Sequence, residues 1–152
     1  MPGNRLLLVE DDDDFRHCMA DNLLDAGFEV VEAEGGSQAM GILERQTHFD
    51  ALVTDIQMPG RFDGNDVAKR AKSRCPGLPV IYLSGSPESL TNQIDRCDAF
   101  FSKPFPSSRI IDEIRRLMNL SAVSLRTRHQ ERYSEPDVAE VLTSSRVPVR
   151  SG

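Results

Sequence analysis

Short apolar runs alternate along the chain with stretches of helical spacing, and no other feature constrains the fold as strongly. The runs are rich in Val, Leu, Ile and Phe and are too short for helices, which is typical of buried strands. They lie at residues 5–9, 28–33, 51–54, 80–84 and 99–102. Each run is expected to form one strand of a sheet whose faces are covered by the segments between them.

Between these runs, apolar residues recur every three or four positions, as they do on one face of a helix. Phe15, Met19 and Leu23 predict a first helix that ends at Gly27. Strands that alternate with helices indicate parallel βαβ units, so we predict a doubly wound α/β fold with a five-stranded parallel sheet and helices on both faces. Further helices are expected around residues 39–43, 67–71 and 110–118, with a weakly marked one over 86–96.

Composition excludes several classes of protein. The 152 residues, with 39% hydrophobic and 28% charged residues, suit one globular domain with a modest appendage. No apolar stretch is long enough to cross a bilayer, and the first residues lack the apolar core of a signal peptide, so we expect a cytoplasmic protein without a membrane anchor. The three cysteines, Cys18, Cys75 and Cys97, have no metal-ligand spacing and are expected to be free thiols.

Polar side chains follow the predicted strands at the points where they end. Glu10 and Asp11 follow the first strand, Asp55 the third, Ser84 ends the fourth and Lys103 follows the fifth. Ligands of open α/β sheets bind at the carboxyl ends of the strands, so these groups are expected to converge. Three carboxylates repel one another unless a cation neutralises them, and oxygen ligands favour a hard divalent ion such as Mg²⁺.

Four motifs of the chain together resemble the receiver domains of two-component response regulators, over roughly residues 4 to 120. They are VEDDDD (9–14), DALVTDIQMPG (50–60), PVIYLSGS (79–86) and FFSKPF (100–105). The resemblance implies a CheY-like, flavodoxin-like fold in which Asp55 is the phosphoacceptor. It also implies an acidic pocket of Glu10 and Asp11 for Mg²⁺ or Mn²⁺, with the backbone carbonyl of Gln57 as a further ligand.

The same resemblance implies roles for three more residues. Ser84 matches the switch hydroxyl, Phe100 the switch aromatic, and Lys103 the lysine that precedes a cis proline. A sensor histidine kinase or a histidine phosphotransfer protein would donate the phosphoryl group, and the receiver would then change its contacts with a downstream protein target. Such a protein is not an enzyme beyond its self-catalysed phosphorylation and dephosphorylation.

The acidic run from Glu10 to Asp14 serves two purposes in this interpretation. Glu10 and Asp11 belong to the pocket, whereas Asp12 is expected to be the N-cap of the first helix. Asp13 and Asp14 then lie in the first helical turn, where negative charge is favourable.

One loop departs from the family pattern. Members commonly carry MPxxDG, whereas this chain has MPGRFDG (58–64), with one more residue between Pro59 and Asp63. Receivers of hybrid kinases have a similar longer loop.

Two alternatives to a stand-alone receiver stay open. One is a Mg²⁺-dependent phosphatase of the aspartyl-nucleophile type, which needs a second aspartate two positions after the nucleophile, where this chain has Gln57. The other is a receiver fragment of a hybrid histidine kinase.

We expect residues 1–120 to form the receiver and residues 121–152 to form a polar tail without an output domain, because the tail is too short for a DNA-binding module. Direct DNA binding is therefore not expected, and homodimer formation is left open. A short helix is expected at residues 135–143, with Val138, Val141 and Leu142 on one face. So short a helix needs a surface to dock on, its own or a partner's, or else it is disordered.

Overall fold

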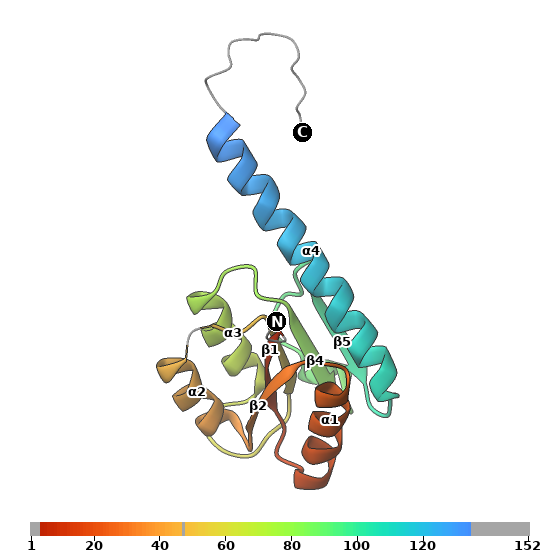
Figure 1. Cartoon of the computed structure of the whole chain (residues 1–152). Coiled ribbons are helices and arrows are strands. Elements are labelled where there is room, and N and C mark those ends of the chain that lie inside the picture. Colours follow the sequence, from red (N-terminus) through yellow and green to blue (C-terminus); the bar gives the residue numbers. More distant parts are fainter. Residues whose placement is uncertain (1–3, 47, 135–152) are drawn as a thin grey trace. The chain divides into compact units, whose positions relative to one another are not determined.

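The computed structural model describes residues 4–46 and 48–134 of the chain. All five predicted strands are present, each within one residue of its expected bounds (Figure 1). The elements are β1 (Arg5–Val9), α1 (Asp13–Asp25), β2 (Glu29–Ala33), α2 (Gly36–Arg45), β3 (Ala51–Asp55), α3 (Gly64–Arg74), β4 (Val80–Ser84), the 3₁₀ turn η1 (Pro87–Ser89), β5 (Asp98–Ser102) and α4 (Ser107–Ser134).

The strands form one parallel sheet in the order β2-β1-β3-β4-β5, so the predicted doubly wound fold is confirmed. The strand order reverses beside β1, between β2 on one side and β3 on the other. Val9, at the end of β1, pairs with Ala33 and Thr54, which brings the carboxyl ends of three strands level. This is the edge at which open α/β sheets bind their ligands.

Alternate residues of the strands point to opposite faces of the sheet, and each face has its own helices. The α2 and α3 helices lie on one side of the sheet and α1 lies on the other (Figure 1). On the α2–α3 face the buried residues are Leu7, Val9, Leu52, Val80 and Tyr82 from the strands, with Ala39, Ile42, Leu43, Val67, Ala68 and Ala71 from the helices. On the other face Leu6, Leu8, Val53, Ile81 and Leu83 pack with Met19, Ala20 and Leu23 of α1 and Ile110, Ile114 and Leu117 of α4.

The ends of α1 agree with the signals in the sequence. The carboxylate of Asp12 accepts a hydrogen bond from the backbone N–H of Phe15 at 3.0 Å, so Asp12 is the N-cap, as predicted. Asp13 and Asp14 occupy the first turn. The helix is followed by Gly27 with φ of +100°, a conformation that glycine adopts without strain.

The predicted helix over residues 86–96 is wrong, because β4 and β5 are joined by the short η1 turn and an irregular loop. The prediction depended on Leu90 and Ile94, which have helical spacing. In the structure Leu90 packs against the α2–α3 core, whereas 43% of Ile94 is exposed, so the two residues form no common buried stripe. Hydrogen bonds from the side chain of Asn65 hold this loop instead, as described below.

The last helix is longer than the apolar spacing predicts, since α4 continues past residue 118 to Ser134. The sequence contains neither glycine nor proline between Ser107 and Glu135, so nothing local ends the helix earlier. The chain divides into two units, Met1–Ser121 and Ala122–Gly152. The helix expected at residues 135–143 lies outside the described residues.

No helix in the described part of the chain is long and apolar enough to span a membrane. Cys18, Cys75 and Cys97, all among the described residues, are free thiols, as the sequence predicts.

Candidate functional site

Three carboxylates meet at the carboxyl edge of the sheet. One oxygen each from Glu10, Asp11 and Asp55 lies within 4.8 Å of the others. Glu10 and Asp11 follow β1, and Asp55 ends β3, which is hydrogen-bonded to β1, so adjacent strands bring them together. Glu10 and Asp55 are buried, whereas Asp11 is exposed and keeps the cluster open to solvent.

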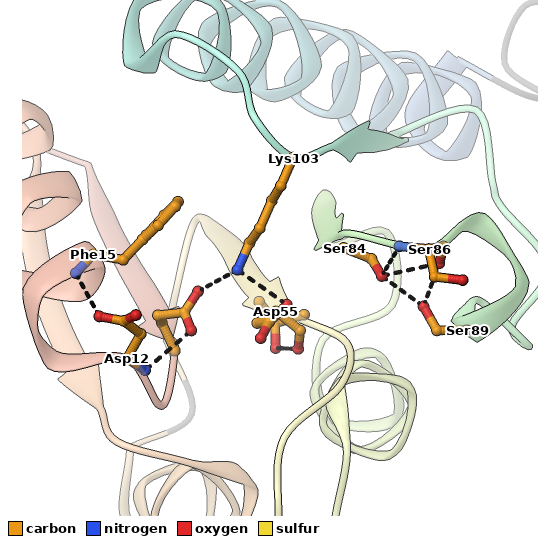
Figure 2. Close-up of polar contacts among 9 residues, drawn as sticks. Asp12, Phe15, Asp55, Ser84, Ser86, Ser89 and Lys103 are labelled. Carbon is orange, nitrogen blue, oxygen red and sulfur yellow. Dashed lines mark hydrogen bonds and ion pairs between the residues drawn. The ribbon is translucent and has the colours of Figure 1, made fainter.

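Lys103 reaches this cluster from the end of β5 (Figure 2). Its Nζ donates a hydrogen bond to Glu10 Oε1 at 3.0 Å and lies 3.5 Å from Asp55 Oδ1. Burial works to lower the pKa of Lys103, but the hydrogen bond to Glu10 and the charge of Asp55 raise it above its usual value. The peptide bond between Lys103 and Pro104 is cis. The ammonium group is thus charged and is directed between two of the three carboxylates.

Asp55 is the carboxylate that its surroundings perturb most clearly. Burial and the negative charge of Glu10 raise its pKa from 3.8 to about 6, although Lys103 acts in the opposite direction. The cluster therefore carries more negative charge than one ammonium group offsets. Clustered carboxylate oxygens are the ligands that Mg²⁺ and Mn²⁺ prefer, so these residues fit a hard divalent cation.

The backbone of Glu10 is fixed by a residue that the sequence analysis did not identify. Arg16 of α1 is buried, and its Nη1 donates a hydrogen bond to the carbonyl oxygen of Glu10 at 2.9 Å. Its Nε binds Glu32 of β2 at 3.1 Å. Asp12 N–H also donates to Glu10 Oε2 at 3.1 Å. No local pattern indicates a link between Arg16 and Glu10, which are six residues apart.

The hydroxyl of Ser84 is directed to the loop that follows β4. It accepts a hydrogen bond from the N–H of Ser86 at 2.9 Å, and its oxygen lies 2.9 Å from the carbonyl of Ser86 and 2.8 Å from Ser89 Oγ. Figure 2 shows Ser84 grouped with Ser86 and Ser89, whereas Lys103 points to Asp55. Ser84 is fully buried at the edge of the site, and its hydroxyl has its hydrogen-bonding partners in its own loop.

Residues 6–115 match the model of the response regulator receiver domain. The chain belongs to the response regulator receiver family. Among its relatives, the response regulator receiver protein CpdR of Brucella abortus is 32% identical over 117 residues, which cover 75% of this chain and 96% of CpdR. The response regulator protein FleR of Pseudomonas aeruginosa is 30% identical over 115 residues, which cover 74% of this chain but only 24% of FleR.

Solved receiver structures agree with this assignment. A response regulator receiver protein from Sinorhizobium medicae superposes with a TM-score of 0.73 at 29% identity, covering 78% of this chain and 97% of that one. The receiver domain of the hybrid histidine kinase CckA superposes with a TM-score of 0.63 at 28% identity, covering 76% of this chain and 99% of that one. The sheet and its helices are thus those of a CheY-like receiver, with the 3₁₀ turn η1 as the helical element between β4 and β5.

Two other residues expected to act in this receiver lie on β5 and shortly after β3. Phe100 of β5 is half-buried and packs against the α2–α3 core, as does Leu90 of the neighbouring loop. Gln57 follows β3 by two residues, and its side chain is exposed. Their roles as switch aromatic and as a source of a carbonyl ligand stay predictions.

The longer loop of residues 58–64 packs against the start of α2 and the end of β3. Met58 is buried, and the carbonyl oxygen of Phe62 approaches Gly36 at the start of α2 so closely that a Cβ there would clash with it. Gly60 takes up the turn with φ of +106°. At the end of the loop, Gly64 N–H donates to the carbonyl of Ile56 at 2.8 Å. The additional residue is therefore accommodated between α2 and the end of β3.

Proposed function

We propose that this receiver accepts a phosphoryl group on Asp55 from a sensor histidine kinase or a histidine phosphotransfer protein, and then changes its contacts with a downstream protein. The observation that carries the proposal is the position of Asp55, a buried carboxylate within 4.8 Å of Glu10 and Asp11 and 3.5 Å from Lys103. An acceptor needs to be ionised and to face positive charge, and this carboxylate meets both requirements near neutral pH.

Glu10, Asp11 and Asp55, with the backbone carbonyl of Gln57, would hold Mg²⁺ or Mn²⁺. When bound, the ion offsets the negative charge of the acceptor and of the incoming phosphoryl group. The raised pKa of Asp55, which burial and Glu10 cause, supports this assignment because a cation would relieve the same repulsion.

The residues of the chain supply the remaining chemistry. An oxygen of Asp55 forms the new bond to phosphorus, while the bond from phosphorus to the donor's histidine nitrogen breaks and leaves its electron pair on that nitrogen. Lys103 stays protonated and binds a phosphoryl oxygen as a point charge. Phosphoryl transfer depends mainly on positioning and electrostatics, so this small set of groups is sufficient.

Ser84 and Phe100 would report the change to the surface. The Ser84 hydroxyl can bind a phosphoryl oxygen only after it leaves its hydrogen bonds with Ser86 and Ser89. Phe100 belongs to β5, which pairs with β4, and it lies opposite Tyr82 of that strand. A shift at the end of β4 would therefore move the strand that is hydrogen-bonded to the one carrying Phe100.

The receiver domain itself is assigned to residues 1–120, and we place its activity in the cytoplasm, where free thiols such as those of Cys18, Cys75 and Cys97 persist.

A phosphatase is the less favoured alternative, because Gln57 occupies the position at which that class needs its acid/base aspartate.

Incubation with acetyl phosphate and Mg²⁺, followed by intact mass spectrometry, tests the proposal. We expect one phosphoryl group to be added to the parent chain, none in the presence of EDTA, and none to Asp55→Asn. Asp14→Asn, in the same acidic run but exposed, is the matched control and should be labelled normally. Labelling of Asp55→Asn would contradict the assignment.

A further inference from the structure

Lys103 has a third neighbour besides the two carboxylates. Its Nζ lies over the ring of Phe15, 4.6 Å from the ring centroid. A cation within about 6 Å of an aromatic face is attracted by the negative charge density of that face. Figure 2 shows the Phe15 side chain extending from α1 toward Lys103. The ammonium group is thus held between Glu10, Asp55 and the ring.

Phe15 is held both at its backbone and at its ring. Its backbone N–H is bound by the N-cap residue Asp12 at 3.0 Å, which sets the first turn of α1. Phe105 packs against the ring edge-on, with 5.9 Å between the centroids and 73° between the planes. Phe105 in turn lies 6.0 Å from the ring of Phe101. Because Phe105 follows Lys103 by two residues, the same segment that carries the lysine also holds the ring in place.

An aromatic ring suits this position better than another charged partner would. The site already holds three carboxylates, and a fourth would add to the repulsion around Asp55. The ring attracts the ammonium group without a net charge of its own. It also covers one side of the group, and with less water there the pairing of Lys103 with Glu10 and Asp55 is stronger.

We propose that Phe15 is a positioning residue for phosphoryl binding, and that its ring holds the Lys103 ammonium group where a phosphoryl oxygen on Asp55 would meet it. This inference rests on the proposed function of Asp55 and Lys103. Phe15 acts through Lys103 and does not touch the reacting atoms. A residue of purely structural importance would contribute only to the packing with Phe105.

The test compares Phe15→Leu, which keeps an apolar side chain against Phe105, with Phe15→Tyr, which keeps the aromatic face. The full chain, saturated with Mg²⁺, is titrated with beryllofluoride, an analogue of the phosphoryl group, and followed by amide NMR spectra. We expect Phe15→Leu to bind beryllofluoride about 3- to 10-fold more weakly, within the range of cation–π energies, and Phe15→Tyr to bind within about 2-fold of the parent. Equal binding by the parent and Phe15→Leu would overturn the proposal.

A double-mutant cycle with Lys103→Met separates positioning from packing. If the ring acts through the ammonium group, Phe15→Leu has no further effect on beryllofluoride binding once Lys103 is replaced. The same loss in both backgrounds would assign Phe15 to packing alone. Mg²⁺ affinity is expected to be the same in the parent and in Phe15→Leu, because Phe15 is not among the metal-binding residues.

A third readout does not depend on phosphoryl chemistry. The methylene protons next to the Lys103 ammonium should show an upfield ring-current shift in the parent and in Phe15→Tyr, and lose it in Phe15→Leu. Unshifted methylene protons in the parent would overturn the contact itself. A parent that shows this shift but binds no beryllofluoride would contradict the proposed function of the site, so the two failures are distinguishable.

Discussion

Replacing Asp55 by Asn should stabilise the protein at neutral pH when no divalent cation is present. Burial and the charge of Glu10 raise the pKa of Asp55 to about 6, so its ionised form is less favourable in the folded protein than in the unfolded chain. Asparagine has nearly the same shape and carries no charge. The substitution therefore removes an unfavourable term, even though Lys103 loses one of its two carboxylate partners.

The size of this effect follows from linkage. A rise in pKa from 3.8 to about 6, at about 1.4 kcal/mol per pKa unit, sets a ceiling of about 3 kcal/mol at pH 7.5. Water reaches the cluster through the exposed Asp11 and screens the charges, so we expect about 1–2 kcal/mol. The pKa of Asp55 is higher in the folded protein than in the unfolded chain, so this group makes the parent more stable at low pH. Its contribution to the free energy of unfolding then falls by about this amount as pH rises from about 4 to about 6. The advantage of the Asp55→Asn variant is therefore full above about pH 6 and disappears near pH 4.

Urea unfolding in EDTA at several pH values between 4 and 7.5 measures the difference in free energy of unfolding between the parent and Asp55→Asn. Glu44→Gln, which removes an exposed carboxylate on α2, is the control for a general effect of net charge. Adding Mg²⁺ should stabilise the parent by mass action and the variant much less. If Asp55→Asn were neutral or destabilising at pH 7.5 in EDTA, the account of the Asp55 environment would be refuted.

Three further substitutions test other parts of the site and its surroundings. Ser89→Ala removes one hydrogen-bonding partner of the Ser84 hydroxyl. Because that hydroxyl then has one hydrogen bond fewer to leave, beryllofluoride should bind about 2- to 5-fold more tightly, and unchanged binding would show that Ser89 does not restrain Ser84. Asp98→Asn removes the carboxylate 2.9 Å from the Nζ of Lys72, which keeps Asp95 at 3.0 Å. It should lower the free energy of unfolding, measured in urea, by roughly 1–3 kcal/mol, and an unchanged value would show that this ion pair does not stabilise the fold. Gly64→Ala places a Cβ well inside van der Waals contact with the carbonyl oxygen of Asp55. It should therefore lower both the unfolding midpoint and the rate of labelling by acetyl phosphate, and normal values of both would contradict the close approach.

The features that could be predicted from the sequence are those that depend on local pattern. Each strand is a short apolar run, and in a parallel sheet the residue that ends a run must lie at the carboxyl edge. Glu10, Asp55 and Lys103 could therefore be placed together before any contact was known, and the structure brings them together. The N-cap Asp12 is equally local, since its partner is three residues away.

The features that could not be predicted depend on contacts between distant segments. Phe15 and Arg16 look like ordinary residues of an amphipathic helix. Their importance appears only when Lys103, which follows β5, and Glu32 of β2 are brought to α1. The direction of the Ser84 hydroxyl is another such feature. Its partners Ser86 and Ser89 are close in sequence, but a helix over residues 86–96 would have placed them differently.

The loop between β4 and β5 shows why local spacing fails there. Asn65, the second residue of α3, is buried, and its side chain donates to the carbonyl of Ser89 at 2.9 Å and accepts from the N–H groups of Thr91 and Asn92 at 3.1 and 3.2 Å. These backbone groups are satisfied by a side chain more than twenty residues away, so a helix is not needed to satisfy them. Gly64, directly before Asn65, packs on the Asp55 carbonyl, and Ser89 binds the Ser84 hydroxyl. One series of contacts therefore joins the end of β3 to that hydroxyl. A segment irregular in secondary structure is thus fixed by tertiary hydrogen bonds next to the Ser84 hydroxyl.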